Sequence, residues 1–203
     1  VYKRQAHTYK LVSTGVGHAP TLMIDGVLMH RIKDLKPEID ASIKVRSTIK
    51  PGDNVLDTCT GLGYTAIQCV KAGATHVTSV EKDENVLLLA KNNPWSKELF
   101  NNPRIDVLLG DITKLIKNFE DSQFSAIIHD PPRMALAGEL YAKEFYKELY
   151  RVLEKGGRLY HYTGAPGAKY RNKRIQKGVV ERLRSVGFNA KIVKSLGGIL
   201  AKK

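Results

Sequence analysis

Two groups of polar residues in this sequence have types and spacings that could do chemistry. In the first, Asp57 ends a short apolar segment, and Gly61 and Gly63 follow four and six residues later. A glycine turn between a strand and a helix lets a ligand approach the backbone and directs helix N–H groups at it. The turn also fits the G-x-G-x-x-G/A pattern of dinucleotide-binding proteins. Glu81, 18 residues after Gly63, could hold a ribose in either case.

The carboxylate of Asp57 distinguishes a dinucleotide, which carries a pyrophosphate, from a cationic nucleoside ligand. A negative charge at the strand end would repel a pyrophosphate but attract a cation. S-adenosylmethionine carries an ammonium and a sulfonium and no phosphate, so Asp57 favours it over a dinucleotide. An NAD-dependent oxidoreductase is therefore the weaker alternative.

The second group follows the apolar segment 124–129 and reads Asp130-Pro131-Pro132-Arg133. Two prolines fix the backbone and remove two N–H donors, which leaves their carbonyl groups as acceptors. Asp130 and the Pro131 carbonyl could accept both hydrogens of an exocyclic amine and hold its lone pair toward the sulfonium methyl group. Neither of the two cysteines, Cys59 and Cys69, follows the prolines, so a thiolate attack of the cytosine-C5 type has no nucleophile.

As an ordered set, these motifs resemble those of class I S-adenosylmethionine-dependent methyltransferases. The likeness runs from about residue 50 to the end. It is nearest to a group of predicted methyltransferases from archaea that contain an Asp-Pro-Pro-Arg motif. The resemblance implies S-adenosylmethionine as cofactor. The cofactor site that it implies has three parts: Asp57, Thr58, Gly61 and Gly63 around the methionine moiety, Glu81 with Lys82 at the ribose, and Asp111 with Ile112 at the adenine.

The resemblance also suggests a catalytic set, which consists of Asp130, Pro131, Pro132 and Arg133. This run is similar to the Asp/Asn-Pro-Pro-aromatic motif of enzymes that methylate exocyclic amino groups of bases. Arg133 stands where an aromatic residue is usual, and a guanidinium can stack on a base or hold a phosphate.

Charge predicts the partner. Lys and Arg outnumber Asp and Glu by 33 to 20, a net charge of +13, and such a positive field favours a polyanion. Basic residues gather in the first 50 residues and again in 167–184. The predicted nucleic-acid contacts are Lys169, Tyr170, Arg171, Lys173 and Arg174. Tyr160 and Tyr162 could either stack on a base or pack inside the protein.

Alternating strand-like and helix-like segments predict the scaffold that positions these groups. Strands are expected at 54–57, 76–81, 105–109, 124–129 and 158–162, and helices at 64–71, 85–92, 138–154 and 173–186. This order predicts an α/β, Rossmann-like, doubly wound and mostly parallel sheet. A closing hairpin, 190–193 with 198–202, adds an antiparallel strand.

Two parts of the chain are expected. Residues 1–50 form an N-terminal extension on the substrate side, with strands at 9–12 and 21–30 and a helix at 34–49, and residues 51–203 form the methyltransferase domain. Two cysteines and no long apolar run indicate a cytoplasmic protein without a disulfide scaffold, a membrane span or a metal site.

The function predicted from the sequence is methyl transfer to an exocyclic amino nitrogen of a base in structured RNA, either rRNA or tRNA. The alternatives are methyl or aminopropyl transfer to a small amine, and an RNA-binding module that holds S-adenosylmethionine without turnover. The oligomeric state stays open.

Overall fold

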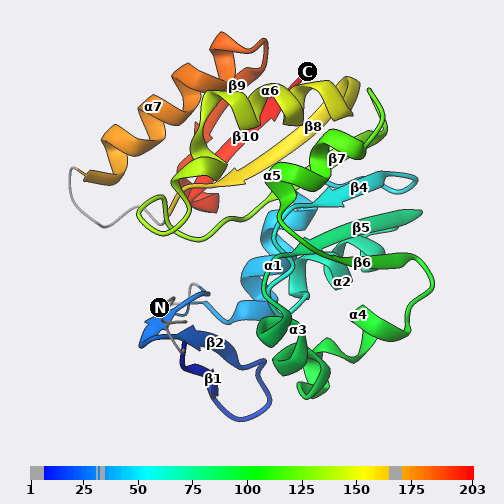
Figure 1. Cartoon of the computed structure of the whole chain (residues 1–203), viewed down its shortest axis with the longest axis vertical. Helices are drawn as coiled ribbons and strands as arrows, with labels where there is room; N and C mark the ends of the chain where they lie inside the picture. Colours follow the sequence, from blue (N-terminus) through cyan, green and yellow to red (C-terminus); the bar gives the residue numbers. More distant parts are fainter. Residues whose placement is uncertain (1–6, 31, 33–34, 165–170) are drawn as a thin grey trace, which may run out of the picture.

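A seven-stranded sheet organises the chain, for which the computed structural model describes residues 7–30, 32, 35–164 and 171–203 (Figure 1). The strand order is β6-β5-β4-β7-β8-β10-β9, and the first five of these strands are parallel. The strands are β4 (Asn54–Asp57), β5 (His76–Glu81), β6 (Ile105–Leu109), β7 (Phe124–His129), β8 (Leu153–Tyr162), β9 (Asn189–Val193) and β10 (Gly198–Lys202). β10 runs antiparallel to both of its neighbours, so the predicted fold is confirmed.

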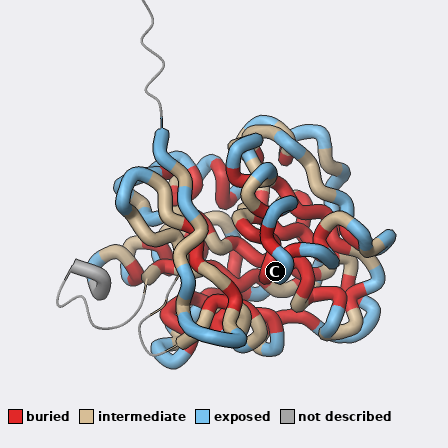
Figure 2. The backbone as a smooth tube through the Cα atoms, turned by 90° about the horizontal axis from the view of Figure 1, so that it is seen from below, coloured by how far each residue is buried: buried red, intermediate tan, exposed pale blue. Residues whose placement is uncertain are grey.

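Helices cover both faces of this sheet. They are α2 (Tyr64–Lys71), α3 (Glu84–Lys91), α4 (Lys97–Asn101), α5 (Ile112–Leu115), α6 (Lys143–Val152) and α7 (Arg171–Ser185), with 3-10 turns at Pro94–Ser96, Ile116–Asn118, Gly138–Tyr141 and Lys194–Leu196. Strand residues alternate between the two faces: Val55 joins the cluster under α2, whereas Leu56 joins the cluster under α6. Figure 2 shows the resulting buried backbone through the middle of the molecule, with exposed loops around it.

A small antiparallel sheet precedes this core. It consists of β1 (Tyr9–Val12), β2 (Thr21–Ile24) and β3 (Val27–Leu28), and the helix α1 (Pro37–Arg46) follows it. The predicted strand at 21–30 is broken at Asp25 and Gly26, where φ is 49° and 79°. Two consecutive positive φ values make a tight hairpin turn, for which Asp-Gly is a favoured pair. Pro37 begins α1, as expected from its fixed φ.

The predicted helix 138–154 is wrong in its extent. A 3-10 turn ends at Tyr141, Ala142 is extended, and α6 runs only from Lys143 to Val152. The chain then enters β8 at Leu153, before Gly156 and Gly157. A Cβ on Gly157 would lie 2.7 Å from Leu153, so glycine at this position permits a close return of the backbone and does not end a helix.

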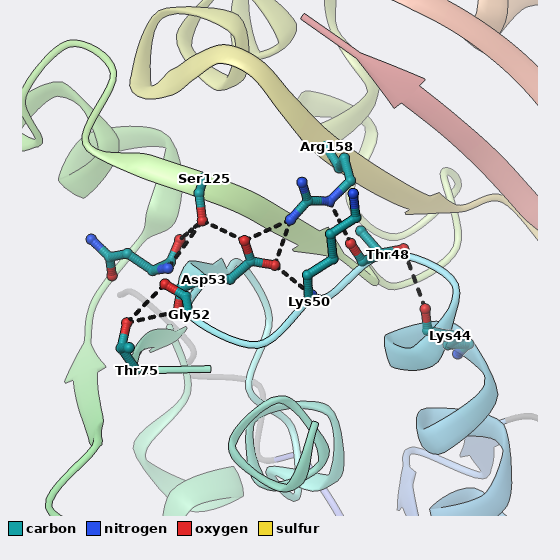
Figure 3. A network of polar contacts seen from close by, with 9 residues as sticks. Lys44, Thr48, Lys50, Gly52, Asp53, Thr75, Ser125 and Arg158 are labelled. Atoms are coloured by element: carbon teal, nitrogen blue, oxygen red, sulfur yellow. Dashed lines mark hydrogen bonds and ion pairs between the residues drawn. The ribbon is translucent and has the colours of Figure 1, made fainter. Parts of the chain in front are cut away.

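An ion pair between buried Asp53 and partly buried Arg158 ties the segment after α1 to the sheet (Figure 3). Arg158 of β8 donates through Nη2 to both oxygens of Asp53, at 2.6 and 2.5 Å, and through Nε to the Thr48 carbonyl at 2.7 Å. The Asp53 carboxylate also accepts from the Ser125 hydroxyl and the Lys50 N–H. Burial alone would raise the pKa of Asp53, but the hydrogen bonds, that of Arg158 first, outweigh burial and lower it. The pair therefore fixes the segment between α1 and β4 against β7 and β8.

None of the helices in the described part of the chain combines the length and the apolar character that crossing a bilayer requires.

Candidate functional site

The carboxyl ends of the parallel strands bring the two predicted groups of residues together. Asp57, at the end of β4, pairs with Ser79 of β5 on one side and with Ile128 of β7 on the other. Glu81 and Asp130 each lie two residues beyond these partners, so they flank the turn that follows β4. Ligands of open α/β sheets bind at this edge, where neighbouring crossovers diverge.

The two glycines of the turn have different roles. Gly61 has a φ of +53°, and open space lies where a Cβ would stand, so its bare face permits a ligand to approach. Gly63 has a φ of +80°, but a Cβ there would lie 2.5 Å from Leu99 of α4. Gly63 thus packs against the core and does not face an open surface. Thr58, also predicted to contact the cofactor, is 1% exposed, and its hydroxyl contacts His129 of β7 at 2.7 Å.

Asp57 lies beneath the turn and not on its surface. It is fully buried, and its Oδ2 accepts hydrogen bonds from Ser79 at 2.8 Å and Thr65 at 3.1 Å. Its Oδ1 has no hydrogen-bond partner among the described residues. Burial first, and then the charges of Asp130 and Glu81, raise the pKa of Asp57 to about 7, while the hydrogen bonds from Ser79 and Thr65 oppose this rise. These carboxyl groups are therefore close enough to affect one another's charge.

Glu81 turns its carboxylate toward the glycine turn. Its Oε2 accepts from the Gly61 N–H at 2.9 Å, and its Oε1 accepts from the Asp83 N–H at 3.1 Å. Burial raises the pKa of Glu81, although backbone N–H groups oppose this effect. The pKa of the Cys59 thiol is raised by burial and then by the charges of Glu81, Asp57 and Asp130. Cys59 thus lies among all three carboxylates.

The residues predicted at the adenine end are present at the neighbouring strand end. Asp111 caps α5, because its Oδ1 accepts from the N–H and the hydroxyl of Thr113. Ile112 is 5% exposed and belongs to the core. Lys82 is exposed and lines an open groove of about 490 Å³ together with Tyr9, Asp83 and other residues of this edge.

The loop after β7 carries the predicted catalytic residues, which differ in exposure. The Asp130 side chain is 22% exposed, Pro131 is buried and Arg133 is exposed. The Pro132 carbonyl is not available, because it accepts from the Tyr141 hydroxyl at 2.9 Å. This contact holds the loop against the turn before α6.

His129 connects this loop to the glycine turn. Its Nε2 lies 3.0 Å from the Leu140 carbonyl, which can only accept, so Nε2 carries the proton and Nδ1 accepts from Thr58. Burial lowers the pKa of His129 to about 4, which keeps the ring neutral. Sequence reasoning found no role for His129, because the contact joins residues 71 positions apart.

The N-terminal segment supplies a cation to this edge that the sequence reading missed. Lys44 of α1 places Nζ 2.7 Å from Oδ2 of Asp130 and 2.6 Å from Oδ2 of Asp40. Nζ also lies over the Tyr162 ring, 4.3 Å from its centroid. The Asp40–Lys44 spacing of four residues on a predicted helix is a recognisable ion-pair signal. Nothing in the spacing shows that the pair faces Asp130.

A second contact anchors the small sheet near Glu81. The hydroxyl of Tyr9, in β1, donates to Oδ2 of Asp83 at 2.6 Å. Tyr160, by contrast, is fully buried and donates to the Leu196 carbonyl, so it packs inside the protein.

The structure describes only some of the basic residues that were predicted to bind RNA. Lys169 and Tyr170 lie outside the described residues. Arg171 and Lys173 belong to α7, and Arg174 is exposed on the same helix. Figure 1 shows α7 beside β9 and β10, at the opposite end of the molecule from β1 and β2.

Comparisons with known proteins point to a different substrate class. Residues 20–194 match the family model of the spermine/spermidine synthase domain. An uncharacterized protein of Methanocaldococcus jannaschii is 53% identical over 197 residues, which are 96% of this chain and 67% of that protein. The polyamine aminopropyltransferase of Thermoplasma acidophilum is 26% identical over 148 residues, which are 71% of this chain and 54% of that protein.

A solved structure supports the fold. It is the crystal structure of a spermidine synthase in complex with the transition-state analogue AdoDATO, with a TM-score of 0.75 and 19% identity. The match covers 94% of the present chain and 68% of the chain of that synthase. The present chain spans about half the length of the polyamine aminopropyltransferases that it matches.

These findings overturn the prediction of an RNA methyltransferase. The fold resembles class I methyltransferases as expected, but spermine and spermidine are small polycations, and the family and the relatives are named for them. RNA as partner, RNA binding and RNA modification are therefore wrong predictions. The positive net charge was a misleading signal, because lysines on the surface raise the net charge of a protein whether or not it binds a polyanion. By the match over residues 20–194, this chain belongs to the spermine/spermidine synthase domain family.

Proposed function

We propose that this protein transfers an aminopropyl group from decarboxylated S-adenosylmethionine to the nitrogen of a small amine. The family match and the relatives named polyamine aminopropyltransferase support this reading over methyl transfer. It corresponds to one of the alternatives that the sequence left open.

The observation that carries the proposal is the group of carboxylates at three neighbouring strand ends. Asp57 pairs in register with Ser79 and Ile128, and Glu81 and Asp130 follow these partners by two residues, so the three carboxylates lie at one edge of the sheet. Decarboxylated S-adenosylmethionine differs from S-adenosylmethionine by the loss of one carboxylate, so it carries positive charge only. A cluster of carboxylates attracts such a donor and repels the carboxylate of the methyl donor.

The residues of this edge fit the donor. The open face of Gly61 admits a ligand to the backbone, and Glu81 beside it offers carboxylate oxygens to ribose hydroxyls. Lys82 follows Glu81 at the end of β5, and Asp111 lies at the next strand end, after β6, where the adenine would be held. Asp57 is fully buried below the turn and its Oδ1 has no partner among the described residues, and a cationic donor above it would favour the ionised form of this carboxyl, whose pKa is raised to about 7.

Asp130 would handle the amine. When bound, the donor supplies a sulfonium whose aminopropyl carbon an amine nitrogen can attack. The new bond is C–N, the C–S bond breaks with its electron pair going to sulfur, and the nitrogen then gives up one proton. Asp130 accepts a hydrogen bond from that N–H and receives the proton, while the buried Pro131 fixes the backbone that carries it. Residues 1–50 would cover the substrate side, as the contacts of Lys44 and Tyr9 support.

Donor binding tests this function without turnover. Calorimetry should show that decarboxylated S-adenosylmethionine binds at least tenfold more tightly than S-adenosylmethionine, a difference of ~1.4 kcal/mol. Glu81→Gln should weaken both donors, because the amide loses the carboxylate's charge-assisted hydrogen bonds to hydroxyl groups. Equal affinity for the two donors, or tighter binding of S-adenosylmethionine, would count against aminopropyl transfer.

Two alanine substitutions separate the roles of the glycines. Both positions have positive φ, which costs alanine about 1 kcal/mol. Gly63→Ala should cost about 3 kcal/mol in unfolding free energy, because its methyl group also collides with Leu99. Gly61→Ala should cost only about 1 kcal/mol but weaken the binding of 5′-methylthioadenosine at least tenfold. Urea unfolding and calorimetry measure the two effects, and the reverse ranking would contradict the assignment of Gly61 to the ligand side.

A further inference from the structure

The loop that carries Asp130 is closed by the 3-10 turn that follows it, which is hydrogen-bonded to the loop at two points. The Leu140 carbonyl of this turn accepts a hydrogen bond from Nε2 of His129 at 3.0 Å. The hydroxyl of the next residue, Tyr141, donates to the Pro132 carbonyl at 2.9 Å. Asp130 therefore lies between two residues that are both hydrogen-bonded to the same turn.

Packed rings fix the side chains that make these two contacts. The ring centroid of His161, in β8, lies 4.3 Å from that of His129 and 5.1 Å from that of Tyr141. Nε2 of His161 is in turn 2.8 Å from the Tyr146 hydroxyl of α6, so its own ring is held as well. All four side chains are buried. Because interiors are close-packed, these rings cannot change rotamer without displacing one another, and the loop is held in one position.

Thr58 connects this loop to the donor side of the site. Its hydroxyl donates to Nδ1 of His129 at 2.7 Å, and its N–H donates to the Ile128 carbonyl at 3.0 Å. A neutral imidazole has one donor and one acceptor, and the Leu140 carbonyl and the Thr58 hydroxyl use both. Thr58 directly follows Asp57 and is 1% exposed, so it can pass on the position of the donor turn without contacting a ligand itself.

We propose that Thr58, His129 and Tyr141 are positioning residues, which hold the Asp130 carboxylate at a fixed place relative to the donor that binds at the glycine turn. The proposal rests on the proposed function and deepens it, because it states what sets the geometry between donor and amine. All three side chains are buried and act through Asp130. A misplacement of about 1 Å can cost ~10² in rate, so a hydrogen bond lost from this set should lower the rate.

Two substitutions test this inference, because each removes one hydroxyl and keeps the shape of the side chain. Thr58→Val and Tyr141→Phe should each lower the rate of amine alkylation at least about tenfold, with decarboxylated S-adenosylmethionine and 1,4-diaminobutane both saturating. Thr58→Ser keeps the hydroxyl and should lose far less than Thr58→Val. The affinity for 5′-methylthioadenosine, measured by calorimetry, should change less than about twofold, because both hydroxyls bond to the protein and not to the donor.

Two further measurements separate positioning from a loss of stability. Ser125→Ala is the matched control, since it removes a hydroxyl at the other end of β7 that donates to Asp53 at 2.8 Å. It should be less stable and keep the unaltered rate. In an Asp130→Ala background, Thr58→Val and Tyr141→Phe should each change the rate less than about twofold, because no carboxylate remains to be positioned.

The unaltered rate in either Thr58→Val or Tyr141→Phe would overturn the proposal. A full loss that persists in the Asp130→Ala background would overturn it too, because the two hydroxyls would then act on something other than Asp130. If Thr58→Val does not fold, Tyr141→Phe decides alone, since it keeps the buried ring and its contact with His161. Failure of the proposed function is distinct: the unaltered protein would then alkylate no amine, and the present inference would fall with it.

Discussion

Asp130→Ala is expected to lose ~10²–10³ of the rate of amine alkylation, with a much smaller loss of donor affinity because Asp57 and Glu81 remain. Within the 130–133 motif, the Asp130 carboxylate is the only negatively charged hydrogen-bond acceptor, and it is partly exposed at the strand ends. Its loss removes the acceptor for the amine N–H and the destination of the proton. Release of 5′-methylthioadenosine under saturating donor and amine measures the rate, and calorimetry measures donor affinity.

Asp130→Asn separates the two roles of this residue. The amide oxygen still accepts a hydrogen bond but cannot take a proton at neutral pH, so the rate should fall less than in Asp130→Ala. Asp106→Asn is a matched control on the exposed edge strand β6, where the side chain is 64% exposed and contacts His76. An Asp130→Ala protein that turns over at the unaltered rate would remove Asp130 from the chemistry.

Asp53→Ala should lower the unfolding free energy by about 3 kcal/mol, the lower end of the range for breaking a buried ion pair. The replacement leaves the Arg158 guanidinium without its carboxylate and the Ser125 hydroxyl and Lys50 N–H without their acceptor. Arg158 keeps 24% exposure, so water offsets part of the loss. Urea unfolding measures the change. Donor binding to the folded fraction should persist, because Asp53 lies at the amino end of β4.

The pH dependence of this loss has a definite sign. The native pKa of Asp53 is lowered, so its contribution is present above the ordinary value of 3.8 and disappears as the pH falls through the native value. The difference between Asp53→Ala and the unaltered protein should therefore shrink below about pH 4. Asp121→Ala breaks the exposed pair with Arg151 and should leave stability nearly unchanged. An equal loss in both variants would contradict the structural role of Asp53.

The sheet could be read from the sequence because its strands are buried, short and bounded by turns. Four predicted strands, 54–57, 76–81, 105–109 and 124–129, agree with the structure at both ends. The short helices at 97–101 and 112–115 were missed, because a single turn shows no periodicity. The early end of α6 was missed because Gly156 and Gly157 looked like a helix stop, whereas they lie within a strand.

The candidate site could be predicted only where it follows strand ends. Asp57, Glu81 and Asp130 meet because parallel strands end at one edge. Lys44 could not be placed there, since its contact spans 86 residues and depends on how α1 packs. Gly63 matched a ligand-binding motif although it faces Leu99, because a close helix contact and a ligand both require glycine. The substrate class was misread from the net charge, which carries no information about which face the charges occupy.

The product of a mixed reaction tests the central claim most directly. The protein would be incubated with equal amounts of decarboxylated S-adenosylmethionine and S-adenosylmethionine, together with butylamine and 1,4-diaminobutane, and the products identified by mass spectrometry. We expect an amine that has gained an aminopropyl group, with 5′-methylthioadenosine as the nucleoside product. An amine that has gained a methyl group, with S-adenosylhomocysteine released from the same mixture, would contradict the proposed function.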